Sequence, residues 1–148
     1  MLAYHDADEE HHQEKEIAPG IFMSYLCDGN VIAFRLTTPV IGSLETLAQF
    51  SQDLLNSVPE ERPVLLLYEG STDLPLTPTM TWMGVRLFRA FCASGRDIYV
   101  AATNPDKLTQ ESLTLFGRGL IGVLSGGKVH FHNFTSRESA VLWLSSWL

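Results

Sequence analysis

The chain has 148 residues and a mass of 16.5 kDa, with 45% hydrophobic and 18% charged residues, which suits one globular domain with a single core. Residues 1–16 hold six acidic side chains against one lysine, whereas residues 17–148 hold eleven acidic and nine basic side chains. The formal net charge of -7 is therefore concentrated at the N-terminus, and the composition excludes the basic stripe that a nucleic-acid backbone requires.

The sequence also argues against a membrane or secreted protein. No run reaches the ~18 apolar residues of a membrane span, and residues 1–16 lack the basic and apolar regions of a secretory signal. Cys27 and Cys92 lie in apolar stretches, which favours buried thiols in a reducing compartment. We expect a cytoplasmic protein with no membrane or nucleic-acid partner. Residues 1–16 would form an acidic tail or a peripheral helix, and residues 17–148 one domain.

The first predicted elements are the two strands of a β-hairpin over residues 21–36. The apolar runs IFMSYLC and NVIAFRL flank Asp28 and Gly29, a pair that readily adopts the positive φ angles of a tight turn. An amphipathic helix is predicted over residues 44–58 and ends at Pro59, because apolar residues recur there at steps of three and four. Ser43 stands before this helix as a candidate N-cap.

The next elements alternate between strand and helix. Residues 63–70 open with a continuous apolar run, typical of a strand buried on both faces of a parallel sheet. Residues 79–94 have a helical pattern closed by Gly95, and residues 97–103 form another buried strand. A further helix is predicted from Lys107, and a strand over residues 128–134. The last helix begins near Thr135, which has the spacing of a capping box with Glu138.

This order predicts the α/β fold class, with a single mixed β-sheet opened by a hairpin and about four helices packed on it. Gly117, Gly119 and Gly122 have the G-x-G-x-x-G spacing of dinucleotide-binding loops. Such loops lie between a strand and the N-terminus of a helix, whereas these glycines follow a predicted helix and precede a predicted strand. We interpret them as a helix C-cap and a tight connection, and we predict no cofactor.

Candidate catalytic and metal-binding residues are sparse. His130 and His132 share one face of a predicted strand, but no third ligand lies at a recognisable spacing. We expect solvent-facing histidines on an edge strand and no metal. No catalytic residue is predicted, although Glu69, Asp73 and Asp106 fall at or after the C-terminal ends of strands, where open α/β sheets bind ligands.

Two stretches resemble the STAS domain family, the fold of bacterial anti-sigma factor antagonists. DGNVIAFRL and TTPVIGSLETLAQF are similar to the family's opening strand and first helix, and FTSRESAVLWL is similar to the end of its last strand and its closing helix. The resemblance implies a STAS-like domain over residues 17–148. It also implies a Ser or Thr, phosphorylated by a partner kinase, at the start of the helix after the second apolar strand. In LTPTMTWMG the D-S-S-G motif of the family is absent, so Thr77, Thr79 and Thr81 form either a phospho-switch or ordinary capping chemistry.

The helix predicted over residues 79–94 is apolar around much of its circumference, so it needs cover on more than one side. Trp, Met and Arg are enriched at protein contacts, and the candidate interface residues are Met80, Trp82, Met83, Arg86 and Arg89. We expect a non-enzymatic domain that acts through protein–protein contacts, as a homo-oligomer or with a regulatory partner protein. The alternative is a small-ligand binder or an enzyme that uses the loops at the C-terminal ends of the strands.

Overall fold

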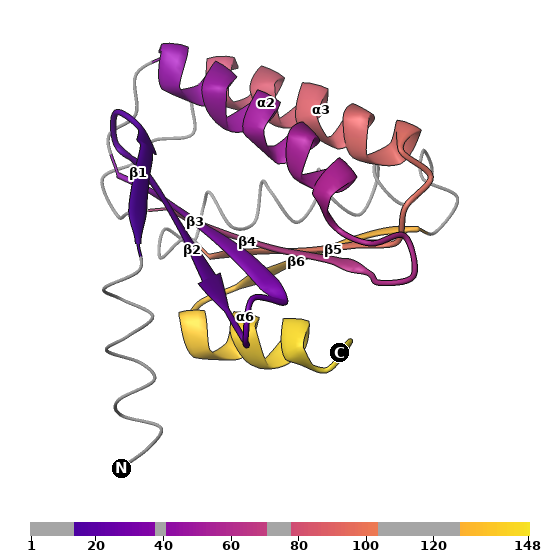
Figure 1. Ribbon diagram of the computed structural model, residues 1–148. Helices are drawn as coiled ribbons and strands as arrows, with labels where there is room; N and C mark the ends of the chain where they lie inside the picture. Colours follow the sequence, from indigo (N-terminus) through magenta and orange to yellow (C-terminus); the bar gives the residue numbers. More distant parts are fainter. Residues whose placement is uncertain (1–13, 38–40, 71–77, 104–127) are drawn as a thin grey trace.

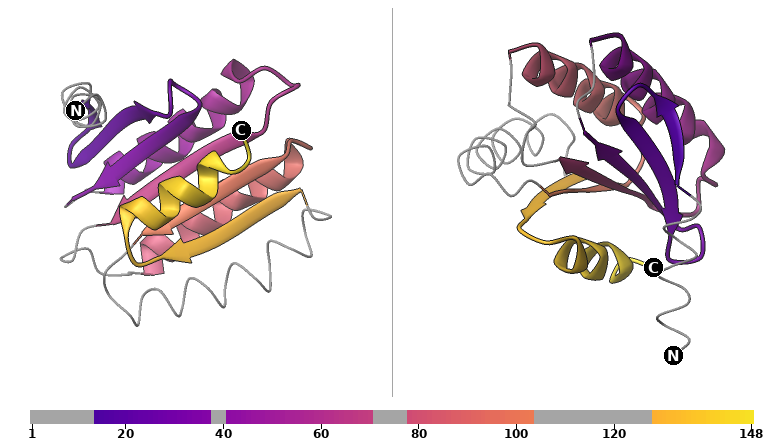
Figure 2. Two further views of the ribbon diagram at one scale, coloured as in Figure 1. Left: turned by 90° about the horizontal axis from the view of Figure 1, so that it is seen from below. Right: turned by 90° about the vertical axis from the view of Figure 1, so that its left-hand side faces the viewer.

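The computed structural model describes residues 14–37, 41–70, 78–103 and 128–148, with only the backbone described at Ile41 and over residues 78–85. These segments form one six-stranded sheet with helices on both of its faces (Figures 1 and 2). The strands are β1 (Lys15–Ala18), β2 (Ile21–Leu26), β3 (Val31–Leu36), β4 (Val64–Gly70), β5 (Ile98–Thr103) and β6 (Val129–Phe134). The helices are α2 (Ile41–Ser57), α3 (Pro78–Ala93) and α6 (Arg137–Ser145).

The sheet is mixed, and its strands lie in chain order from β1 to β6. The pairs β1–β2 and β2–β3 are antiparallel, whereas β3, β4, β5 and β6 run parallel. The predicted hairpin is confirmed, because Cys27, Asp28 and Gly29 all have positive φ and the Gly29 N–H donates to the Leu26 carbonyl at 3.1 Å. The chain therefore reverses within four residues, between Leu26 and Val31.

Two hydrophobic clusters lie on the two faces of the sheet. α2 and α3 lie side by side over one face, and α6 covers the other (Figure 2). Side chains alternate along β3, so that Ile32 and Phe34 belong to the cluster under α2 and α3, whereas Val31 and Ala33 belong to the cluster under α6. The apolar run in β4 is confirmed as a strand covered on both faces, since residues 64–67 are all buried.

The first strand is the main feature that the sequence did not predict. Lys15 and Glu16 were expected in the acidic tail, but they lie in β1 and pair with β2. The segment is short and opens with two exposed charged residues, and its strand conformation depends on pairing with β2. The expected boundary between residues 16 and 17 therefore divides a strand.

Two predicted helix starts are wrong. α2 begins at Ile41, so Ser43 lies within its first turn and is buried instead of capping the helix. The N-cap of α6 is Ser136, whose Oγ accepts a hydrogen bond from the Ser139 backbone N–H at 3.2 Å. The predicted capping box from Thr135 is therefore displaced by one residue.

The α/β class and the mixed sheet are confirmed, with three helices among the described residues. Gly95 has the predicted left-handed conformation, with a φ of 69°, just after α3. The fourth helix, expected from Lys107, falls in the segment 104–127 and lies outside the described residues.

Candidate functional site

A groove of about 540 Å³ opens where the parallel strands β3 and β4 begin. Four segments form its walls: the β2–β3 hairpin, the end of α2, the connection from α2 to β4, and the residues after α6. Ile32, Leu54 and Leu65 line it as buried side chains of β3, α2 and β4. We call this cavity the N-end groove. Its volume lies within the range of about 300–1,000 Å³ that is common for binding sites.

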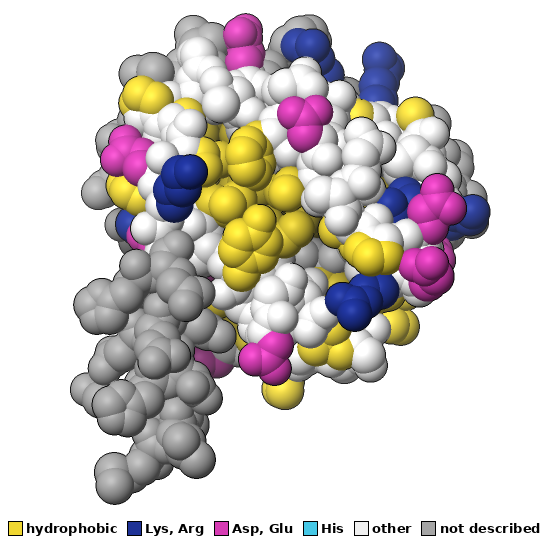
Figure 3. Space-filling view, viewed as in Figure 1, with side chains coloured by type: hydrophobic (Ala, Val, Ile, Leu, Met, Phe, Trp, Pro, Cys, Tyr) yellow, Lys and Arg dark blue, Asp and Glu magenta, His cyan; other side chains and the backbone are white. Residues whose placement is uncertain are grey.

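Large apolar side chains are exposed around the N-end groove. Four large hydrophobic side chains of the described residues are exposed, and three of them line the groove: Tyr25 at 43%, Trp147 at 42% and Leu148 at 64%. Only Leu142, at 73%, is not among the groove residues. Hydrophobic side chains also gather between α2 and strands β2 and β3 (Figure 3). Apolar surface that converges on one hollow is typical of an interaction site, whereas scattered apolar residues are not.

One wall of the groove is held by arginine side chains. The Arg96 guanidinium donates to the carbonyls of Leu55 at 2.6 Å and Pro59 at 2.8 Å, which ties the end of α2 and the connection after it to the turn before β5. Arg62, which lines the groove, donates to the Asn30 side-chain oxygen at 3.2 Å. These contacts join the hairpin and the α2–β4 connection, so the groove is formed before a ligand binds.

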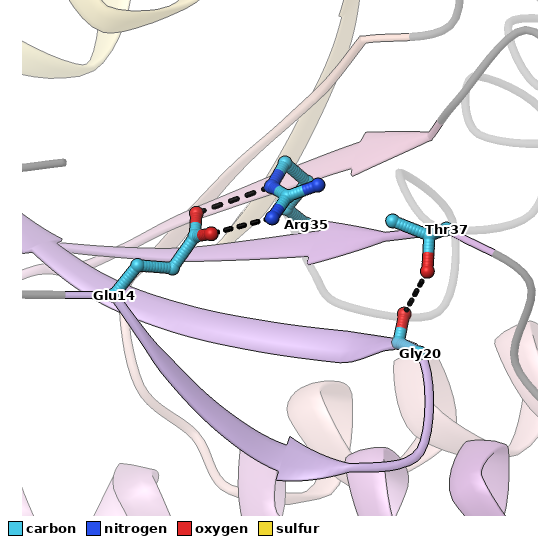
Figure 4. Close-up of polar contacts among 4 residues, drawn as sticks. All are labelled: Glu14, Gly20, Arg35 and Thr37. Atoms are coloured by element: carbon cyan, nitrogen blue, oxygen red, sulfur yellow. Dashed lines mark hydrogen bonds and ion pairs between the residues drawn. The ribbon is translucent and has the colours of Figure 1, made fainter. Parts of the chain in front are cut away.

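A row of charged side chains crosses the other end of the sheet, where the parallel strands end. Both oxygens of the Glu14 carboxylate accept hydrogen bonds from Arg35 (Figure 4), and the Arg35 guanidinium lies 4.5 Å from the centre of the Phe22 ring. Arg35 is opposite Glu69 in the register of β3 and β4. Glu69 in turn pairs with Arg137 at 3.0 Å. We call Glu14, Arg35, Glu69 and Arg137 the charged row.

The charged row links the first described residue of the chain to the N-terminus of α6. The hydrogen bonds from Arg35 to the Glu14 carboxylate raise the pKa of Arg35, and the charge of Glu69 acts in the same direction. Near this end of the sheet the Thr37 hydroxyl donates to the Gly20 carbonyl at 3.0 Å, which fixes the β1–β2 turn against the end of β3 (Figure 4). Acidic and basic groups alternate along the row, so its charges compensate one another.

The two strand histidines belong to an aromatic cluster under α6. Tyr99 stacks on His130 with ring centres 4.6 Å apart and on Trp147 at 4.2 Å, and burial raises the pKa of Tyr99. His132 is exposed, but its ring lies 4.9 Å from that of Trp143. The expectation of solvent-facing histidines is therefore wrong for His130, which is half-buried by this stacking. Within the described segments no group of three or more metal-ligating side chains converges.

The structure describes the side chains of only some of the predicted site residues. Arg86 and Arg89 are exposed on α3. Thr79, Met80, Thr81, Trp82 and Met83 lie in α3 as backbone only, and Thr77 lies outside the described residues, as do Asp73, Asp106 and the three glycines at positions 117, 119 and 122. Glu69 lies in the charged row, where it pairs with Arg137. Both cysteines are half-buried, and burial raises the pKa of Cys92.

The groove residues were not recognised from the sequence. Tyr25 and Trp147 each lie in a locally apolar segment, IFMSYL and LWLSSWL, where the pattern is that of ordinary core residues. Tyr25 is exposed although it lies in a hairpin strand, and Trp147 follows the last residue of α6 by two positions. The available signal was the density of large apolar residues at the end of the chain, where residues 142–148 hold two tryptophans and three leucines.

The structure is an α/β domain with a groove at one end of its sheet, bordered by exposed apolar side chains, and a row of compensating charges at the other end. Comparisons of the chain with protein-family models, curated proteins and solved structures found no match. Of the helices that the structure describes, none has both the length and the apolar character needed to cross a membrane.

Proposed function

We propose that this chain is a non-enzymatic, STAS-like domain that acts through protein–protein contacts. The opening hairpin, the alternation of strands and helices, and the closing helix after the last strand support a STAS-like arrangement. In this proposal the domain that begins with β1 acts as one binding module, and its partner is a regulatory protein or another copy of the chain.

One observation carries the proposal: Tyr25, Trp147 and Leu148 expose apolar surface around a single groove. Burying a large apolar side chain completely contributes about 1.5–3 kcal/mol, so completing the burial of a half-exposed aromatic ring contributes about 1 kcal/mol. Aromatic anchors in a preformed hollow are typical of the residues that dominate binding energy at protein contacts. An apolar segment of a partner protein is the occupant that this surface would take.

A photo-cross-linking amino acid tests the proposal when it replaces Tyr25 in the full-length chain inside the cell. We expect a discrete adduct with one protein, identified by mass spectrometry and lost when Trp147→Glu is added. Leu142 is the matched control, because it is a large exposed apolar residue of the same protein that does not line the groove.

The identified protein is then purified, and calorimetry measures its affinity for the wild-type chain and for Trp147→Glu. We expect at least about a tenfold loss, because a buried carboxylate would replace an aromatic contact. Equal adducts from positions 25 and 142, or an unchanged affinity, would contradict a role for the groove.

The alternative function, a small-ligand binder or enzyme, is favoured by a different observation. Glu69 lies at the C-terminal end of β4 between Arg35 and Arg137, at the end of the sheet where α/β proteins commonly bind ligands. A ligand with an anionic group would compete with Glu69 for these arginines. Thermal shift with a panel of nucleotides, sugar phosphates and dicarboxylates tests this function, which predicts a stabilisation that Arg137→Gln removes.

The proposal extends to a phospho-switch at Thr77, Thr79 or Thr81. A phosphate adds a charge of about -1.5 to -2, which is favoured at the N-terminus of a helix such as α3. Mass spectrometry of the protein purified from its own cells should find phosphate on this segment. A triple Thr→Ala variant should abolish it, and phosphate found only elsewhere would refute the switch.

A further inference from the structure

α2 and α3 form a two-helix layer whose helices carry opposite charges. α2 contains two acidic residues, Glu45 and Asp53, and no lysine or arginine. α3 contains two basic residues, Arg86 and Arg89, and no aspartate or glutamate. All four side chains are exposed. The outer surface of the layer is therefore divided lengthwise into an acidic half and a basic half.

The two helices run in the same direction, and their charged stretches overlap along the layer. α2 connects β3 to β4 and α3 connects β4 to β5, and these strands are parallel. Figures 1 and 2 show the helices side by side. Arg86 lines a groove of about 380 Å³ together with Glu45 and Gln49 of α2. Arg89 follows Arg86 by three residues, about 4.5 Å along the helix, whereas Asp53 follows Glu45 by eight residues, about 12 Å, so the charged stretches of the two helices overlap without matching residue by residue.

We propose that a second copy of this chain docks on the two-helix layer, with a two-fold axis parallel to the helices. The inference rests on the proposed function, protein–protein contact, and names one partner. This axis puts α2 of one copy over α3 of the other, so that the helix with Glu45 and Asp53 faces the helix with Arg86 and Arg89 twice in the dimer. An axis across the helices would put α2 on α2 and α3 on α3, where like charges oppose association.

The size of the layer determines how strong the dimer is. Helices of 17 and 16 residues present a face about 25 Å long and about 20 Å wide, because a helix rises about 1.5 Å per residue and packed helices lie about 10 Å apart. This area is at the lower end of specific interfaces. We therefore expect a dissociation constant on the order of micromolar, with association that weakens as salt screens the charges.

Two charge-reversed variants test the arrangement. The acidic variant carries Arg86→Glu and Arg89→Glu, and the basic variant carries Glu45→Arg and Asp53→Arg. The altered side chains are all exposed, and circular dichroism with thermal melts verifies that each variant folds. Sedimentation equilibrium of the wild type should show a monomer–dimer equilibrium at about 50 mM salt that shifts to monomer near 500 mM.

Each variant alone should dimerise at least about tenfold more weakly than the wild type, because all facing charges have the same sign. Mixed in equal amounts, the two variants should form a heterodimer, since every acidic helix of one then faces a basic helix of the other. A wild type that stays monomeric across micromolar concentrations would overturn the inference, and so would association that neither variant changes or a mixture that stays monomeric. The groove variant Trp147→Glu should dimerise normally, so failure of this dimer and failure of the groove proposal remain distinguishable.

Discussion

The packing of α6 on the sheet predicts a large difference between two leucines of the same helix. Leu144 is fully buried against the cluster that contains Leu65 and Leu67, whereas Leu142 is 73% exposed. Replacing Leu144 with alanine removes buried methyl groups and leaves a cavity, which costs about 3 kcal/mol of unfolding free energy in well-packed cores. The same replacement at Leu142 should change stability by no more than about 0.5 kcal/mol.

Urea denaturation followed by tryptophan fluorescence measures both unfolding free energies. For a domain of this size a loss of about 3 kcal/mol lowers the melting temperature by roughly 6–12 °C. The two variants change helix propensity almost equally, so the difference between them reports burial. Equal losses for Leu142→Ala and Leu144→Ala, or a loss below about 1 kcal/mol at Leu144, would refute the docking of α6. The position of Trp147 at the groove would then have no support.

Three further predictions concern ionisation, the charged row and α3. Burial raises the pKa of Tyr68 well above its usual 10.0. The neutral side chain therefore contributes to stability below pH 10, and this contribution falls at higher pH, because only the unfolded state ionises. In pH-dependent melts, Tyr68→Phe should flatten the loss of stability above about pH 10, and an unchanged slope would count against this assignment. A double-mutant cycle with Glu14→Gln and Arg35→Gln should give a coupling of about 0.5–1 kcal/mol, because the pair is bidentate but partly exposed, and additive effects would mean that the row does not hold the strand. Trp82→Glu should weaken self-association in sedimentation while the circular dichroism spectrum stays unchanged, and wild-type assembly by this variant would remove α3 from the interface.

The sequence predicted the elements whose conformation is decided locally. The hairpin depends on Asp28 and Gly29, which take positive φ as expected, and the end of α3 depends on Gly95. The strand β4 could also be predicted from its own residues, because a strand buried on both faces is apolar at consecutive positions and not only at alternate ones. In each case the conformation is determined by residues that are close together in the sequence.

The features that were missed depend on residues distant in the chain. β1 forms because β2 offers hydrogen-bonding groups and because Arg35 holds Glu14, and neither cause is visible in the segment KEIA. Tyr25 and Trp147 both line the groove, and the packing of α6 on the sheet brings them close together. The shift from Thr135 to Ser136 as the N-cap has a smaller cause, since both hydroxyls suit that position and packing of α6 decides between them.

The first strand also protects one edge of the sheet from pairing with other molecules. β1 has four residues, a register irregularity between Glu16 and Ala18, and two exposed charged side chains at its start. Short, irregular and charged strands are poor templates for pairing with another chain, whereas β2 beneath it is a regular strand of six residues rich in apolar side chains. β1 therefore serves as a protective border. A chain in which the Glu14–Arg35 contact is broken should precipitate faster on heating than its loss of stability alone explains, because the backbone of β2 becomes accessible to other molecules.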